Sequence, residues 1–132
     1  MGMQGHYGMD SFSGDAIASA MKRYSKVVGA VQLTEVDIKI NETYDTSADG
    51  IAEMNETIKK RYNMLVFNIK SAIADGAKLE GLTFWGTVDK YSWLQSRSNI
   101  GGGNKTGLPQ MPLLFDQNYE PKPCFFVFSD KK

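Results

Sequence analysis

Cysteine and histidine are almost absent from this chain, which has one of each in 132 residues. The lone cysteine, Cys124, excludes an internal disulfide and a zinc site built from several thiolates. The lone histidine, His6, excludes two-histidine zinc motifs. A Ser-His-Asp triad would have to use it, although no Gly-x-Ser-x-Gly segment is present. We therefore predict neither a metal site nor a cofactor.

An excess of charge of either sign is also missing, because 15 basic residues balance 15 acidic ones. This balance argues against nucleic acid or an anionic membrane as the main partner. No apolar run approaches the roughly 20 residues of a membrane-spanning helix, and the start carries no signal-like segment. The length and a hydrophobic content of 42% suffice for one domain over 1–132 with one core.

Apolar periodicity predicts strands that alternate with helices. Residues 1–7 read as the end of a strand, and helical spacing follows over 15–28 and again over 51–75. Strand-like runs occupy 30–38 and 79–86. This alternation indicates βαβ units in a parallel sheet and places the chain in the α/β class.

The last third of the chain is less regular. A glycine-containing stretch without clear periodicity runs to about residue 111. Residues 121–128 have a strand-like composition, whereas proline in a first turn favours a helix. Composition alone leaves both possibilities open for this segment.

The second predicted strand ends in two carboxylates. Because side chains on a strand alternate with period two, Val31, Leu33, Glu35 and Asp37 are expected on one face. Parallel-barrel enzymes carry their reacting groups at the C-terminal ends of strands. The pattern makes the two acids candidates for catalysis, and the plain alternative for Glu35 is a solvated strand end.

The other two predicted strands also end in chemically useful side chains. Gln4 and His6 close the first strand, and Trp85 closes the third, followed by Asp89 and Trp93. Sugar hydrolysis uses such a set, because an acid attacks or stabilises the anomeric carbon and indole faces stack on sugar rings. The ordinary alternatives are a hydrogen-bonded structural histidine and tryptophans in the core.

Six short segments occur in an order that resembles a known family. They are GMQGH at 2–6, TEVD at 34–37, FWG at 84–86, DKYSWL at 89–94, LLFD at 113–116 and PKP at 121–123. Together they resemble the C-terminal part of glycoside hydrolase family 10, the endo-1,4-β-xylanases. The resemblance implies a TIM (β/α)8 barrel that hydrolyses xylan with retention, this chain being about three β/α units with parallel strands.

The resemblance also implies a role for the candidate residues of the first two strands. Glu35 would be the catalytic nucleophile, and His6 would hydrogen-bond near it. Asp37 would hold His6 in place, and Gln4 would lie in the same network.

For the rest of the chain, the resemblance implies a substrate cleft and a last helix. Trp85 and Trp93 would shape the floor and wall of the xylose-binding cleft. Residues 122–129 would form the last helix of the barrel, against their strand-like composition.

Most of such a barrel has no counterpart in this chain. A complete barrel takes about 250 residues, and the resemblance covers only strands six to eight. Retaining hydrolysis needs two carboxyls about 5–5.5 Å apart, and the family's acid/base glutamate lies on strand four. We therefore expect the isolated chain to be inactive.

The same resemblance sets the expected partners and location. Xylan or xylo-oligosaccharides would bind, and the chain would form a homo-oligomer or pair with the missing N-terminal part of the barrel. The parent enzyme would be secreted or held at the cell surface. The alternative is a non-catalytic fragment that only binds carbohydrate or self-assembles.

Overall fold

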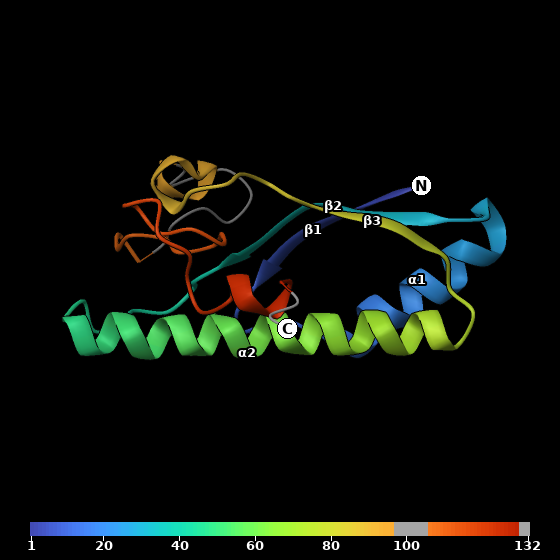
Figure 1. The fold of residues 1–132 in the computed structure, drawn as a ribbon, viewed down its shortest axis with the longest axis horizontal. Coiled ribbons are helices and arrows are strands. Elements are labelled where there is room, and N and C mark those ends of the chain that lie inside the picture. The colour runs from blue at the N-terminus through green and yellow to red at the C-terminus, as the bar shows by residue number, and fades with distance from the viewer. Residues whose placement is uncertain (97–105, 130–132) are drawn as a thin grey trace.

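The structure, a computed structural model, describes residues 1–96 and 106–129. Three strands form one parallel sheet in the order β1 (Gly2–Gly8), β2 (Val31–Lys39) and β3 (Leu79–Phe84). The helix α1 (Gly14–Val28) connects β1 to β2, and α2 (Ala48–Ala74) connects β2 to β3 (Figure 1). The predicted partial barrel of βαβ units is confirmed.

Both helices begin and end where local chemistry dictates. The hydroxyl of Ser13 accepts a hydrogen bond from the Ala16 amide and caps α1, which ends at Gly29 with a positive φ of 82°. Ser47 caps α2 in the same way, so that helix begins at Ala48 rather than at the expected residue 51.

The core lies between one face of the sheet and the two helices, with α2 running beneath the strands in Figure 1. Fully buried side chains of β2, Leu33 and Ile38 among them, meet Met21 of α1 and Tyr62 of α2 in one cluster. The opposite face of the sheet carries the polar side chains of the strand ends. It is the face that would line the interior of a complete barrel.

The predicted alternation along β2 is wrong, because a β-bulge interrupts the strand. Gln4 pairs with Thr34, but the next pair is His6 with Asp37, so β2 has one residue more than β1. Glu35 takes up the difference with a φ of 59°. The carboxylates of the second strand therefore do not share a face with the buried Val31 and Leu33 before them.

The helix expected over 122–129 is also wrong, since only a short 3₁₀ helix, Phe125–Val127, forms there. The backbone before it is engaged elsewhere: Phe115 bridges Pro121, and the Lys122 amide donates to the Leu114 carbonyl. Two further 3₁₀ helices, Asp89–Tyr91 and Trp93–Gln95, follow β3. The predicted irregular stretch is found up to Ser96 and again from Thr106, and its glycines at 101–103 lie outside the described residues.

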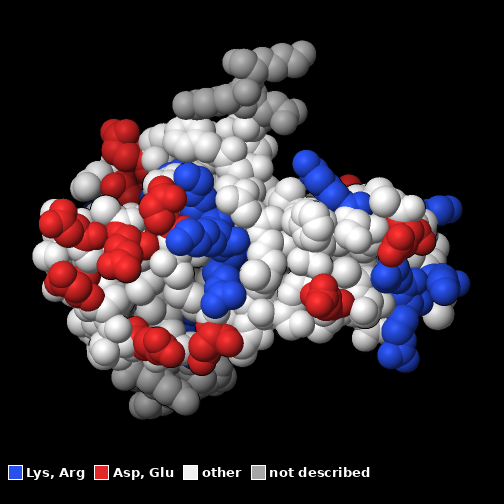
Figure 2. All heavy atoms as spheres, turned by 90° about the horizontal axis from the view of Figure 1, so that it is seen from below, with Lys and Arg blue, Asp and Glu red and all other residues white. Residues whose placement is uncertain are grey.

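The surface mixes charges of both signs. On the face seen from below, clusters of basic side chains are bordered by acidic ones, with uncharged surface between them (Figure 2). Over the described residues, no helix combines the length and apolarity needed to cross a membrane.

Candidate active site

Three strand ends meet at one edge of the sheet and build the candidate active site. His6 comes from β1, and Glu35 and Asp37 come from β2. Trp85 follows β3 directly, and Trp93 lies in the second 3₁₀ helix beyond it. Because the sheet is parallel, the C-terminal ends of all three strands face the same side.

The two carboxylates of β2 flank one imidazole. His6 Nδ1 lies 2.9 Å from Asp37 Oδ1, and His6 Nε2 lies 3.1 Å from Glu35 Oε2. Gln4 Nε2 donates to the other oxygen of Glu35 at 3.2 Å. Both oxygens of Glu35 are thus held, which fixes the orientation of a side chain that is 22% exposed. A carboxylate so fixed and still open to solvent can act as a nucleophile.

Asp37 has a different environment from Glu35. Its side chain is 1% exposed, and Trp93 Nε1 donates to its Oδ2 at 2.7 Å. Burial raises the pKa of Asp37, although the hydrogen bonds from Trp93 and His6 act in the opposite direction. Both of its oxygens are engaged, which leaves neither free to contact another group without breaking a hydrogen bond.

The bulge at Glu35 is what turns this carboxylate toward His6. A non-glycine residue with φ of 59° is strained by about 1–3 kcal/mol. Bulges commonly re-aim a side chain next to a functional site. The left-handed backbone at Glu35 therefore distinguishes this residue from an ordinary strand end and keeps it a candidate for function.

The rings of both tryptophans lie close to the ring of His6. The ring centroids of Trp93 and His6 are 5.1 Å apart, and those of Trp85 and His6 are 6.1 Å apart in an edge-on arrangement. Trp85 is 47% exposed, so a large part of its side chain is open to solvent at this edge of the sheet. The structure thus brings all six predicted site residues together.

Other residues at this edge were not found from the sequence. A cavity of about 180 Å³ beside His6 and Asp37 is also lined by Ser11, Lys39 and Asn41. The signal was available, because these residues come at or just after the ends of β1 and β2. Within residues 1–96 and 106–129, no group of three or more histidine, cysteine or acidic residues is placed to hold a metal ion.

A parallel sheet covered by helices, with carboxylates, an imidazole and indoles at its strand ends, defines a partial β/α barrel of the sugar-hydrolase class. The family model for glycosyl hydrolase family 10 matches residues 1–131, and the chain belongs to that family.

Similar proteins agree with this assignment. The chain is 32% identical to an endo-1,4-beta-xylanase of Geobacillus stearothermophilus, over 96% of this chain and 36% of the relative. Xylanase B from Clostridium stercorarium F9 superimposes with a TM-score of 0.76 at 29% identity, over 98% of this chain and 36% of that one. A GH10 endoxylanase from a sugarcane soil metagenome gives a TM-score of 0.75 at 30% identity, with 96% and 37% covered. The chain spans about a third of the length of these relatives.

Proposed function

We propose that this chain supplies the nucleophile side of an endo-1,4-β-xylanase site, with Glu35 as the nucleophile. The observation that carries the proposal is the double restraint of this carboxylate by Gln4 and His6 at the C-terminal edge of the sheet. Glu35 attacks the anomeric carbon of a xylosyl unit while a carboxylic acid protonates the leaving oxygen. Water, activated by the same second group, then releases the sugar.

The second carboxyl has to come from outside this sequence. Asp37 is the other acid in the hydrogen-bond network, but His6 and Trp93 occupy its two oxygens and it is 1% exposed. General acid–base catalysis contributes about 10²–10⁴-fold in rate. We therefore expect no appreciable xylan hydrolysis from the isolated chain.

Unpaired surfaces support pairing with the rest of a barrel. Within the described part of the chain, no further strand pairs with the outer edges of β1 and β3. Near its C-terminal end, α1 exposes Tyr24, Val27 and Val28, and the exposed fraction of Val27 reaches 83%. Open strand edges and adjoining apolar surface favour association. We propose that the occupant is the complementary N-terminal part of the barrel, in one longer chain or as a separate piece.

The direct test restores the missing part and then removes the nucleophile. The N-terminal two-thirds of the Geobacillus stearothermophilus relative would be fused ahead of this chain, and the release of reducing ends from xylan would be measured. We expect activity in the fusion that is abolished by Glu35→Gln and kept in Glu80→Gln, which changes an exposed acid of β3. Equal activity in Glu35→Gln and the unmodified fusion would refute the proposed nucleophile.

A non-catalytic role remains as the second candidate, favoured by the exposed indole of Trp85. In that case the isolated chain would bind xylo-oligosaccharides, and Glu35→Gln would leave this binding unchanged.

Because xylan is a polymer that cells do not take up intact, we propose that the parent protein lies outside the cell or on its surface.

A further inference from the structure

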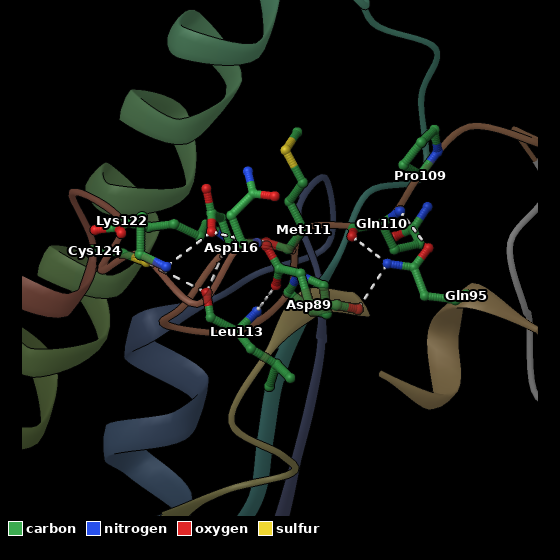
Figure 3. A network of polar contacts seen from close by, with 12 residues as sticks. Asp89, Gln95, Pro109, Gln110, Met111, Leu113, Asp116, Lys122 and Cys124 are labelled. Carbon is green, nitrogen blue, oxygen red and sulfur yellow. Dashed lines mark hydrogen bonds and ion pairs between the residues drawn. The ribbon is translucent and has the colours of Figure 1, made fainter. Parts of the chain in front are cut away.

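A buried lysine connects the C-terminal segment to the loop that carries Trp93. The Lys122 side chain is 3% exposed, and its Nζ donates to Asp89 Oδ2 at 2.8 Å. The same ammonium donates to the carbonyls of Met111 at 2.7 Å and Leu113 at 2.9 Å. All three N–H donors of the ammonium are therefore satisfied in the interior, as Figure 3 shows.

Asp89 joins this lysine to the neighbouring turns. Its Oδ1 accepts the Leu113 amide at 2.8 Å, and its own amide donates to the Phe115 carbonyl. The Asp89 carbonyl accepts the Ser92 amide and also the Gln95 side chain at 2.8 Å. Each polar group of Asp89 is thus engaged, and the residue fixes the start of the segment that leads to Trp93.

A short segment with defined hydrogen bonds connects Asp89 to the active site. The chain passes from Asp89 through two consecutive 3₁₀ helices, and the Ser92 hydroxyl caps the second by accepting the Leu94 amide. Trp93 then donates its indole N–H to Asp37 at 2.7 Å. Asp37 in turn contacts His6, which contacts Glu35. A continuous series of contacts therefore runs from Lys122 to the candidate nucleophile.

We propose that Lys122 is a positioning residue, whose ammonium acts through Asp89 to hold Trp93 against Asp37 and so keeps His6 oriented toward Glu35. Replacing a buried ion pair with apolar residues of similar volume is often neutral or stabilising. Stability alone therefore gives no reason for a lysine here, whereas fixing one arrangement of the Trp93 loop does. Only the last step, to Glu35, rests on the proposed function.

The test reads the position of Trp93 in the isolated chain. Because Trp85 and Trp93 are its only tryptophans, a ¹⁵N spectrum has two indole N–H resonances, and Trp85→Phe assigns them. We expect Lys122→Met to move the Trp93 resonance toward that of a solvated indole. The matched control is Lys59→Met, which breaks an exposed pair with Glu56.

A second measurement follows the pKa of Asp37, whose carboxylate accepts the indole N–H of Trp93. The hydrogen bond from Trp93 lowers the pKa of Asp37, so its loss in Lys122→Met should raise that pKa further, as measured by ¹³C NMR titration. Trp93→Phe should give the same change, and the double variant no more. The groups that interact with Asp37 are His6, Glu35, Trp93 and, from α2, Tyr62, none of which is altered by Lys122→Met itself.

The outcomes separate positioning from a merely structural role. A folded Lys122→Met chain that is only less stable, with the Trp93 resonance and the Asp37 titration unchanged, would overturn the proposal. If Lys122→Met does not fold, the double variant Lys122→Met/Asp89→Asn, which leaves no buried charge unpaired, carries the same test. Neither readout requires catalysis, so a failure here is distinguishable from a failure of Glu35→Gln in the fusion enzyme.

Discussion

Removing the Asp89 carboxylate should destabilise the chain far more than removing a surface carboxylate. Asp89 and Lys122 form an ion pair at 2.8 Å with side chains 4% and 3% exposed. Asp89→Ala leaves the ammonium buried without its counter-charge. Breaking a buried pair from one side costs about 3–5 kcal/mol of folding free energy.

The hydrogen bonds around Asp89 and Lys122 decide where in this range the loss of folding free energy falls. Lys122 keeps the carbonyls of Met111 and Leu113 as acceptors, which places its cost near the lower bound of about 3 kcal/mol. The Leu113 amide loses its acceptor, the Asp89 carboxylate, which adds about 1 kcal/mol. The expected loss is therefore about 4 kcal/mol, a large share of the roughly 5–15 kcal/mol that stabilises a typical domain.

Urea unfolding followed by circular dichroism measures this loss. With an m value of about 2 kcal/mol/M, the midpoint of unfolding should fall by about 2 M. The control is Glu56→Ala, which removes an exposed pair with Lys59 at 3.2 Å. Exposed pairs contribute about 0–1 kcal/mol. Equal midpoints for Asp89→Ala and Glu56→Ala would refute the reasoning, because the buried pair would then matter no more than the surface one.

Three further predictions test the sheet, the site and the cleft. Gly5→Ala should cost about 1–3 kcal/mol in urea unfolding, because its Cβ would lie 2.8 Å from Val36 Cγ2, whereas Gly81→Ala meets nothing within 4 Å and should not destabilise. Burial raises the pKa of Asp37, so protonation of this group favours the folded state, and its contribution is lost as pH rises through the raised pKa. Asp37→Asn should flatten that fall in stability above about pH 4, and an unchanged pH profile would contradict the assignment. Trp85→Ala should weaken xylo-oligosaccharide binding by up to about tenfold in a calorimetric titration of the inactive Glu35→Gln fusion, and unchanged affinity would remove Trp85 from the cleft.

Periodicity and strand-end chemistry were enough to predict the layout of the molecule. Apolar spacing located both helices, because each buries a single stripe against the sheet. Gln4 and His6 could be named as candidates because parallel strands align their C-terminal ends at one edge, whereas the role of Trp93, which lies beyond the end of β3, was implied by the resemblance to family 10. Local sequence supplies both kinds of information.

Side-chain contacts between residues far apart in the chain could not be predicted from the sequence. A lysine is expected at the surface, and nothing near Lys122 in the chain shows that its partner is Asp89, 33 residues away. The C-terminal helix failed for the same reason. Its expected first turn contains Lys122, whose amide and side chain are committed to residues 111–114 and Asp89.

The bulge in β2 interrupts the regular alternation of side chains along the strand, and the position of Glu35 shows why this is needed. In an unbroken strand, Glu35 would share the face of Leu33, which is fully buried against the helices. A carboxylate there would lie in the apolar core, at a large cost in desolvation. The extra residue turns Glu35 to the open face and gives its inward place to Val36, which is fully buried.

The close approach of β1 to this bulge depends on Gly5. A Cβ at position 5 would lie 2.8 Å from Val36 Cγ2 and 3.2 Å from the Thr34 carbonyl oxygen. Glycine next to the bulge and a left-handed backbone at Glu35 are therefore two parts of one arrangement. Gly5 admits the inward Val36, and the strain of about 1–3 kcal/mol at Glu35 is the cost of holding its carboxylate against His6.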